Sequence, residues 1–524
     1  MSVTHLPAAA IWPSLIQQLV SDPASLADFH AGLCTADTLA KRTQERTFSA
    51  ASRSVLVEAL KAQHHGFETT PEVDAALDKL ALENATCITT GHQLCLASGP
   101  LYFLSKIASV VRLAQATEAA TGTPVVPVFW MASEDHDLPE VDHFHLGGKV
   151  LRWNARQTGA VGRMELRGLS NQFEEWAADS TYERWGEGLK AMGRYYREGT
   201  LADATRRLVL DAFGKYGVVV LDGDDPKLKR LFLPVLRREL LNAPSEAAVL
   251  RQTAALKGQG FDGQVHPRPI NLFYLTTGGR HRIVQEEDAW QALDTPHTWN
   301  REGLLAELEA HPQRFSPNVV LRPVYQEAIL PNLAYVGGPG EISYWLQLKE
   351  VFAAFELPYP LLRVRHSTLV VPPYVLRKHG KLGIDWNDYF QDLHALEATI
   401  AQRLDVPDTE QAKAQIKAII DQLAGDFAAF DASLKASVEG EGAKMEKGLD
   451  NLNKKVLRAA KQRSEVALRQ LHDVHQFLFP AGVFQERVTN VLELQPFSAE
   501  ALPQVLVEAL DAHSTDLHLI FTQP

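Results

Sequence analysis

The sequence predicts an α/β protein with a Rossmann-like core and a C-terminal α-helical antiparallel coiled coil. Short apolar strands alternate with helical segments across about 85–370, which is typical of a parallel sheet covered by helices. A heptad pattern begins after about residue 385. We therefore expect a core domain over 1–380 and a coiled-coil domain over 381–524.

Composition narrows the class of protein. The chain has 524 residues and a formal net charge of −12, which argues against a general binder of nucleic acid or of anionic membranes. Three scattered cysteines, Cys34, Cys87 and Cys95, form no CxxC pair and no disulfide framework. The start of the chain lacks the pattern of a signal peptide, and no apolar run reaches the ~20 residues that span a bilayer. We expect a soluble, cytoplasmic protein.

The core begins with a βαβ unit after a mostly helical region over 1–84. ATCITT (85–90) is short and β-rich, and the following LYFLSKIASVVRLAQA carries apolar residues at helical spacing. PVVPVFWM (124–131) is continuous and apolar, as expected of a strand buried on both faces.

Further strands complete the predicted sheet. YGVVVLDGDDP (216–226) is a buried strand that ends in acids, NLAYVGGPGEISYWLQLKEVF (332–352) is a strand-to-helix junction, and LPYPLLRVR (357–365) is the strand after it. INLFYLTTGGRHRIV (270–284) predicts a hairpin with its turn at the Gly-Gly pair. The segments at about 150–215 and 240–315 are expected to be insertions in the core.

The coiled-coil region has a long apolar seam. Its first part consists of Ile416, Ile420, Leu423, Phe427, Phe430 and Leu434, at alternating steps of four and three. Gly440 and Gly442 predict a hairpin turn near 439–442. The segment is either a helical hairpin that packs on its own core or a protruding coiled coil that dimerises. The length of the seam and its polar outer positions favour the second.

The stretch TGHQLCLASGP (90–100) joins the first strand to its helix. Pro100 suits the first turn of a helix, with Gly99 or Ser98 as the preceding cap. Free N–H groups at such a helix start can bind an anion. The alternative is a well-capped helix with no ligand.

Three side chains extend this predicted anion site. His92 and Gln93 lie just upstream of the helix, and Lys106 is about two turns into it, from where it could reach a phosphate. In the alternative, His92 is a surface residue. Cys95 is expected to be a buried structural thiol, because the sequence positions no base for it.

A second polar junction, MASEDHDLPEVDHFH (131–145), follows the apolar second strand. Its acids and histidines are Glu134, Asp135, His136, Asp137, Asp142, His143 and His145. Such a cluster could hold Mg²⁺ or Zn²⁺, bind an amine or act as acid and base, although a charged run is often only solvated. Its spacing matches no zinc signature, so no metal ligand is assigned.

The third junction is YVGGPGEISYW (335–345). Gly337 and Gly338 allow close backbone approach, and Pro339 suits the first helical turn. Glu341 would compete with a bound anion, so it better suits an amine or a hydroxyl; the alternative is a glycine-rich turn with an ordinary acidic helix start. One anion-binding junction and two acidic ones suggest a reaction that joins a phosphorylated or carboxylate partner to an amine.

Four segments together resemble the bacillithiol-biosynthesis cysteine-adding enzymes, a family of cysteine ligases. They occur in order from about 85 to 490: GHQLCLASGPLYFLSK, PVFWMASEDHD, NVVLRPVYQEAILPNLAYVGGPGEISYW and LFPAGVFQER. The resemblance implies a Rossmann-like, nucleotidyltransferase-type core with inserted connective segments, and a coiled coil that makes a homodimer. It implies attachment of cysteine to the amino group of glucosaminyl-malate, the last step of bacillithiol synthesis.

The family is distantly similar to class I aminoacyl-tRNA synthetases, which implies ATP or ADP as the nucleotide, with Mg²⁺ as a further candidate and no tightly bound zinc. Of their His-x-Gly-His loop only Gly91-His92 stands here, and RVRHSTL (363–369) offers arginines but no lysine pair for their second loop. If the analogy holds, cysteine is activated as an adenylate. His92 and Lys106 then stabilise the developing charge, and an acid orients an amine.

These inferences give two sets of candidate residues. The catalytic candidates are His92, Lys106, Asp135, Asp137 and Glu341. The candidates for binding substrate or nucleotide are Gly91, Gln93, Ser98, Gly99, Glu134, His136, Gly337, Gly338, Tyr344, Arg365, Gln485 and Arg487, the last two in a segment expected to return to the core. Two other functions stay open: a metal-dependent hydrolase or amidase built on the EDHD and DHFH cluster, and a non-catalytic nucleotide-binding scaffold.

Overall fold

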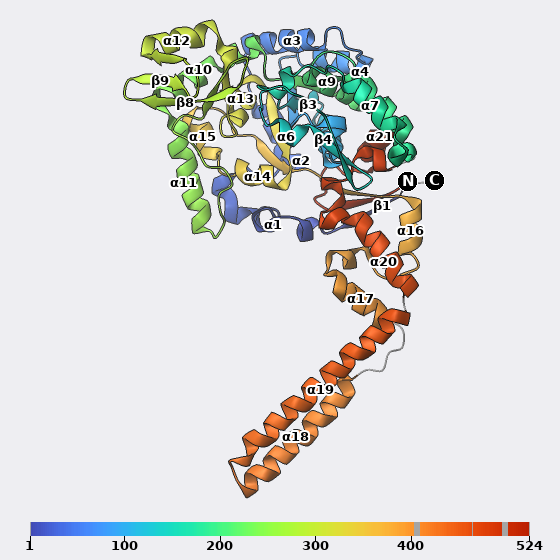
Figure 1. The fold of residues 1–524 in the computed structure, drawn as a ribbon. Helices are drawn as coiled ribbons and strands as arrows, with labels where there is room; N and C mark the ends of the chain where they lie inside the picture. The colour runs from blue at the N-terminus through green and yellow to red at the C-terminus, as the bar shows by residue number, and fades with distance from the viewer. Residues whose placement is uncertain (1, 403–408, 464, 495–500, 523–524) are drawn as a thin grey trace. The chain divides into compact units, whose positions relative to one another are not determined.

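A computed structural model describes residues 2–402, 409–463, 465–494 and 501–522 (Figure 1). The chain forms two compact units. The first contains the residues up to Val370 together with Gln485–Ile520, and the second contains Val371–Phe484 and the residues from Phe521 onward. The boundary therefore precedes the one expected at residue 380, and the chain re-enters the first unit at Gln485.

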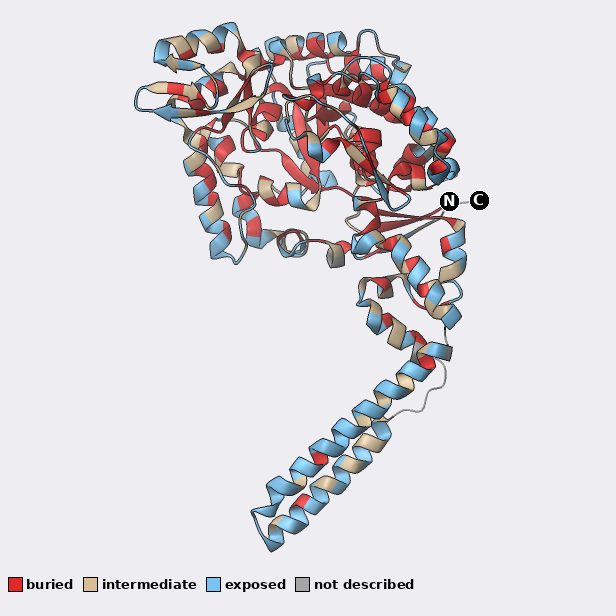
Figure 2. Ribbon diagram, viewed as in Figure 1, coloured by how far each residue is buried: buried red, intermediate tan, exposed pale blue. Residues whose placement is uncertain are grey.

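A parallel sheet of five strands forms the centre of the first unit, in the order β13-β12-β2-β3-β6. The strands are β2 (Thr86–His92), β3 (Val125–Met131), β6 (Val219–Asp222), β12 (Asn332–Gly337) and β13 (Leu361–Val364). Every residue of β2, β3, β12 and β13 is buried, as their apolar sequences predict (Figure 2). Strand order reverses between β2 and β12, so the predicted Rossmann-like core is confirmed.

Helix α5 (Tyr102–Thr121) connects β2 to β3 and packs against both strands. Its apolar residues Val110 and Leu113 share a buried core with Ile88 of β2 and Val336 of β12. Burial of this face against the sheet fixes the helix start next to the carboxyl end of β2.

The predicted start of this helix at Pro100 is wrong, because the first α-helical residue is Tyr102. Before it the backbone takes left-handed angles, with φ of 51° at Ala97 and 61° at Gly99. The Asn490 side-chain amide donates to the carbonyl oxygens of both residues, at 2.8 Å each. A residue far away in the sequence thus holds the turn that local pattern assigned to the helix.

Two long segments interrupt the sheet. Residues 132–218 contain α6 (Leu138–Val141), β4 (His143–Leu146), β5 (Lys149–Arg152), α7 (Leu169–Ala178), α8 (Gly186–Gly193) and α9 (Leu201–Phe213). Residues 223–331 contain α10 (Pro226–Asn242), α11 (Pro244–Gly258), α12 (Arg301–Ala310), α13 (Arg322–Ile329) and an antiparallel sheet in the order β10-β9-β8-β7-β11. Its strands are β7 (Leu272–Leu275), β8 (Arg280–Glu286), β9 (Ala289–Ala292), β10 (Thr298–Asn300) and β11 (Phe315–Pro317). The β7–β8 pair confirms the predicted hairpin.

The other described elements of the first unit include seven α-helices and a small sheet. The helices are α1 (Ser14–Ser21), α2 (Ala36–Glu45), α3 (Ala50–His64), α4 (Pro71–Lys79), α14 (Pro339–Trp345), α15 (Lys349–Ala354) and α21 (Ala501–Ala509). A small sheet has the order β1-β15-β14, from β1 (Ser2–Leu6), β14 (Ser367–Val371) and β15 (Leu517–Phe521). None of the described helices is long and apolar enough to cross a membrane.

The second unit contains the coiled-coil hairpin, which confirms the predicted helical domain. α18 (Glu410–Phe430) and α19 (Leu434–Arg463) lie antiparallel and are largely exposed (Figures 1 and 2). The remaining helices of this unit are α16 (Pro373–His379), α17 (Leu393–Gln402) and α20 (Glu465–Leu478).

The hairpin turn predicted near 439–442 is wrong, because α18 and α19 meet at 431–433. There the Asp431 carboxylate accepts hydrogen bonds from the Ser433 backbone N–H at 2.9 Å and from its hydroxyl at 2.8 Å. Gly442 lies inside α19, where an added Cβ would come within 2.7 Å of Ile420 Cγ2. This glycine allows the two helices to approach closely and does not end a helix.

Candidate functional site

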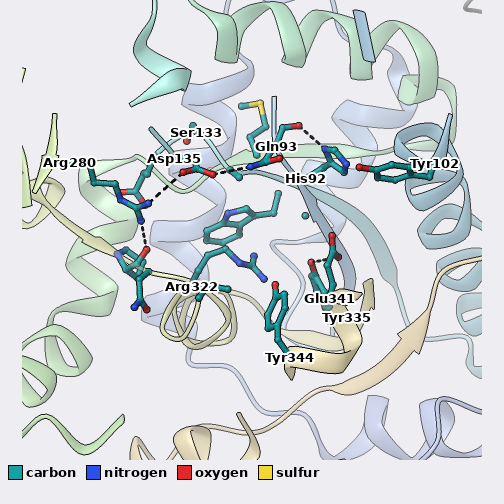
Figure 3. A pocket seen from close by; sticks show the side chains of 18 residues that line it. His92, Gln93, Tyr102, Ser133, Asp135, Arg280, Arg322, Tyr335, Glu341 and Tyr344 are labelled. Carbon is teal, nitrogen blue, oxygen red and sulfur yellow. Dashed lines mark hydrogen bonds and ion pairs between the residues drawn. The ribbon is translucent and has the colours of Figure 1, made fainter. Parts of the chain in front are cut away.

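A cavity of about 400 Å³ opens at the carboxyl ends of β2, β3 and β12 (Figure 3). This is the point where the strand order reverses, and ligands of open α/β sheets bind at such a point. The residues that line the cavity include Gly91, His92, Gln93, Tyr102, Trp130, Glu134, Asp135, Arg280, Asn318, Val319, Arg322, Tyr335, Glu341 and Tyr344. The first and third predicted junctions, together with part of the second, therefore meet in one site.

Lys106 and Glu341 form an ion pair behind the cavity wall. Lys106 is completely buried, and its Nζ donates to Glu341 Oε1 at 2.6 Å and to the Gly91 carbonyl at 2.5 Å. Burial lowers the pKa of Lys106, and the charge of Glu341 opposes that shift. Because its charge is already paired and its donors point at protein oxygens, Lys106 fixes the end of β2. The prediction that Lys106 contacts a phosphate is disfavoured by these two protein partners.

Glu341 is held on its other side by protein donors. Its Oε2 accepts from the Tyr335 hydroxyl at 3.2 Å and from the Gly338 backbone N–H at 3.3 Å (Figure 3). Burial alone would raise the pKa of Glu341, but Lys106 outweighs it and the pKa is lowered. The carboxylate therefore stays ionised and ties α14 to the sheet.

His92 is a buried, neutral histidine at the cavity wall. Its Nδ1 lies 2.8 Å from the Gln93 carbonyl oxygen, which can only accept, so the proton sits on Nδ1. Burial, reinforced by the charge of Lys106, lowers the pKa of His92 to about 4. The ring packs against Tyr102 and Phe103, with centroids 5.3 and 5.1 Å away. Nε2 is thus a hydrogen-bond acceptor, which corrects the prediction that His92 stabilises negative charge.

Arg322, at the start of α13, is a cavity residue that the sequence analysis missed. It makes no ion pair with any described residue, although it lies over the rings of Tyr335 and Trp130 at 5.4 and 5.8 Å. Its Nη1 donates to Gln326 at 3.2 Å, whereas its Nη2 is buried and has no hydrogen-bond partner among the described residues. A signal was present, since a single arginine interrupts the apolar run VVLRPVY.

Gln93, Asp135 and Arg280 form a polar chain along another wall of the cavity (Figure 3). The Asp135 carboxylate accepts from Gln93 Nε2 at 3.1 Å and lies 3.7 Å from Arg280 Nη1. Burial alone would raise the pKa of Asp135, but the Gln93 hydrogen bond and the Arg280 charge outweigh it and lower the pKa. Asp135 is therefore a fixed negative charge in the cavity, next to a second arginine that the sequence analysis missed.

The other side chains of the EDHD and DHFH segments do not form one cluster, because they have different partners or are exposed. Glu134 Oε1 accepts from the buried Lys229 Nζ at 2.5 Å. His136 and Asp137 are exposed and do not line the cavity. Asp142 pairs with Arg152 on the adjacent hairpin. Among the described residues, no group of three or more His, Cys, Asp and Glu side chains is arranged to hold a metal ion.

The predicted anion cradle at Ser98 and Gly99 is also wrong. Neither residue lines the cavity, and the Leu101 N–H at the helix start donates to the Thr489 carbonyl at 2.9 Å. An added Cβ at Gly99 would lie 2.6 Å from Cys95 Cβ, so protein already fills this space. Burial raises the pKa of Cys95 to about 12, in keeping with a structural thiol.

The glycine pair before α14, Gly337 and Gly338, likewise leaves no open anion site. An added Cβ at Gly337 would lie 3.0 Å from both Ile342 and Tyr335 side chains. The Gly338 N–H is already bonded to Glu341, so the first turn of this helix satisfies its own donor. Tyr344, in contrast, lines the cavity and contacts Arg322 there, so its binding role stays a prediction.

The three candidates from the later part of the chain lie outside the cavity. Arg365 forms a buried bidentate pair with Glu486, with N–O distances of 2.8 and 2.7 Å. Gln485 exchanges two hydrogen bonds with the Val370 backbone, at 3.0 and 3.2 Å. Arg487 is exposed. The buried contacts of Arg365 and Gln485 anchor the returning segment to β14 and its neighbour.

The fold and the cavity define a class of protein: a Rossmann-like α/β protein with a small-molecule site at its topological switch point and a helical hairpin appended. Residues 1–366 match the family described as "Bacillithiol biosynthesis BshC, N-terminal Rossmann-like domain". Residues 368–522 match "Bacillithiol biosynthesis BshC, C-terminal coiled-coil domain".

Curated relatives agree with these matches over nearly the whole chain. A protein of Flavobacterium johnsoniae, named "Putative cysteine ligase BshC", is 36% identical over 517 residues, which cover 97% of each chain. Proteins with the same name from Flavobacterium psychrophilum and Salinibacter ruber are 39% and 32% identical and cover 84% and 93% of this chain, and 84% and 92% of their own lengths. The chain belongs to the BshC family of bacillithiol biosynthesis, a family of ligases.

Proposed function

We propose that this chain joins the carboxyl group of L-cysteine to the amino group of glucosaminyl-malate, as the last step of bacillithiol synthesis. The observation that carries the proposal is the pairing of opposite charges in the cavity at the switch point. Arg322 offers a half-buried guanidinium without an ion-pair partner among the described residues, with its Nη2 atom fully buried, and Asp135 offers an ionised carboxylate. An amino acid is a zwitterion, so it needs one site of each sign.

The residues then divide the work as follows. The Arg322 fork binds the cysteine carboxylate, and Asp135 binds its ammonium group. His92 accepts a hydrogen bond at Nε2 from the glucosamine amine and aligns the nitrogen lone pair with the carboxyl carbon. Because the pKa of His92 is about 4, the ring stays neutral at physiological pH and can serve as this acceptor.

We propose ATP as the cosubstrate, which would supply activation of the cysteine carboxyl group. The fit rests on Arg322 Nη2, a buried donor that has no partner in the described part of the chain and suits an anionic oxygen. One guanidinium can contact a carboxylate and a neighbouring phosphate, since it presents five donors. Lys106 and the two glycine-rich junctions are not offered for this role, because their donors are engaged by protein.

We further propose that the hairpin pairs with the hairpin of a second copy. The antiparallel packing of the two helices leaves several of their apolar side chains exposed. Phe430 is 89% exposed, Ile419 56% and Leu452 52%. Apolar side chains in such number on one element favour burial against another protein surface.

Reconstitution tests the function. Purified protein is incubated with cysteine and glucosaminyl-malate, with and without ATP, and the thiol product and AMP or ADP are quantified. We expect product only when all three substrates are present. Product without ATP would remove the cosubstrate from the proposal, and no product in the complete mixture would contradict the ligase.

A further inference from the structure

A second, smaller cavity of about 260 Å³ adjoins the main cavity and shares Arg280, Asn318 and Val319 with it. The other polar residues that line it are His266, Arg268 and Arg282. We call it the basic annex, defined by Arg268, Arg280, Arg282 and His266. Its floor is apolar and comes from Ile270, Leu272 and Phe273.

The annex has an unbalanced positive charge. Three guanidinium groups line it, and none of its described lining residues is acidic. Arg268 and Arg282 are exposed, and neither side chain forms an ion pair or hydrogen bond with a described residue. Arg280 has Asp135 as a partner, but the other two guanidinium groups have no acidic partner among the described residues, so a bound anion would stabilise the arrangement.

Arg280 is a rigid wall between the two cavities. Its Nη2 donates to the Pro317 carbonyl at 2.6 Å and its Nε to the Ser316 hydroxyl at 3.1 Å. The guanidinium lies 4.4 Å over the Phe273 ring, while Asp135 is 3.7 Å away on the side of the main cavity. One molecule can therefore place its amine-bearing end in the main cavity and an anionic end in the annex, on the two sides of Arg280.

Size and charge indicate the chemistry of that end. Sites for whole ligands commonly enclose about 300–1,000 Å³. The annex is smaller, so it suits one end of a ligand whose remainder lies in the main cavity. Planar guanidinium forks match carboxylates, and several of them favour two carboxylates over one.

We propose that the basic annex binds the dicarboxylate end of the amine acceptor, with Arg268 and Arg282 as specificity-determining residues. This inference rests on the proposed function, since it takes the malyl group of glucosaminyl-malate as that end. The annex is built by β7, β8 and the chain before them, within the segment inserted between β6 and β12. The insertion, rather than the Rossmann-like sheet, then selects the acceptor.

The test compares Arg268→Ala and Arg282→Ala with Arg301→Ala. Arg301 is an exposed arginine of the same inserted segment that lines neither cavity. Each annex variant should raise KM for glucosaminyl-malate about tenfold, as loss of a charge-assisted hydrogen bond predicts. KM for cysteine and for ATP should stay unchanged, and Arg301→Ala should match the parent protein. A probe without carboxylates, the methyl glycoside of glucosamine, should be used equally poorly by all four proteins.

Three outcomes separate the possibilities. If the parent protein does not use glucosaminyl-malate, the proposed function itself fails. If it does and both annex variants keep the parent KM for it, only the annex assignment is overturned. If the variants instead raise KM for ATP, the annex binds phosphate and the dicarboxylate assignment is overturned. Circular dichroism spectra of the variants that match the parent spectrum exclude misfolding as the cause.

Discussion

Lys106 Nζ lies 2.6 Å from Glu341 Oε1, which joins α5 to α14 directly behind the cavity. The side chain of Lys106 is 1% exposed and that of Glu341 is 30% exposed. The pair therefore holds the carboxyl ends of β2 and β12 together at the point where strand order reverses. Two residues that sequence pattern assigned to chemistry are, in the structure, each other's partners.

Lys106→Met should destabilise the first unit, because it leaves the half-buried Glu341 carboxylate without its cation. We expect a loss of about 3 kcal/mol in the free energy of unfolding, measured by urea titration with tryptophan fluorescence. Combining it with Glu341→Gln should recover much of this loss, since the amide oxygen still accepts from Tyr335 and Gly338. Simple addition of the two single losses would show that the residues are not coupled.

His92→Phe should lower kcat for cysteine addition by about a hundredfold while the protein stays folded. Phenylalanine keeps the ring contacts with Tyr102 and Phe103 but has no Nε2 acceptor. Stability should change by only about 1 kcal/mol, the value of the lost hydrogen bond to Gln93. The exposed His513→Ala is the control. Equal losses of activity and stability would mean that His92 is only structural.

Arg322→Lys should raise KM for cysteine about tenfold or more, although it keeps the positive charge. A lysine cannot form the two parallel hydrogen bonds that a guanidinium makes with a carboxylate. Steady-state kinetics with cysteine as the varied substrate measures the effect, and KM for glucosaminyl-malate should change little. A variant with parent kinetics would remove Arg322 from the cysteine site.

Stability of the first unit should fall as the pH is lowered from 6.5 to 4, and His64 is one cause. Burial, with the charge of Arg206, lowers the pKa of His64 to about 4, so the unfolded chain binds the proton first. The contribution of neutral His64 to the free energy of unfolding is complete above the unfolded pKa of about 6.5 and is at most about 3 kcal/mol.

Urea unfolding at several pH values checks this, with His64→Gln as the comparison. Glutamine does not titrate, so the variant should be less stable at pH 7 but show a shallower loss between pH 6.5 and 4. An unchanged slope would assign the pH dependence to other buried groups, of which His92 and His366 also have lowered pKa values.

Gly442→Ala should destabilise the hairpin of α18 and α19, although alanine favours helices by about 1 kcal/mol. The new methyl group would lie 2.7 Å from Ile420 Cγ2, and such overpacking costs about 1–3 kcal/mol. Gly440→Ala is the matched control, because an added Cβ there meets nothing within 4 Å and should stabilise the helix. Hydrogen exchange of the hairpin amides in the full chain measures both. Stabilisation by both changes would contradict the close packing.

Periodicity and strand composition predicted the Rossmann-like sheet, the β7–β8 hairpin and the coiled coil, because burial on both faces leaves a direct mark on sequence. The glycines misled in two places. Gly442 was interpreted as a helix end and Gly99 as a helix cap. In the structure a side chain at Gly442 would collide with Ile420, and one at Gly99 would collide with Cys95. Sequence pattern alone does not reveal either contact. Arg322 was overlooked, because one arginine in an apolar run identifies no partner.

By itself the sequence determined the class of fold, the family resemblance and the three junctions where polar residues follow buried strands. Parallel strands bring their carboxyl ends to one edge, so those junctions had to be neighbours. Only the tertiary structure decided which side chains face the cavity and which are already paired with other protein groups. Such pairs join residues that are distant in the sequence. In the structure, Lys106 pairs with Glu341 and Asn490 holds the turn at Gly99. Arg322 lies in the cavity without a carboxylate partner among the described residues.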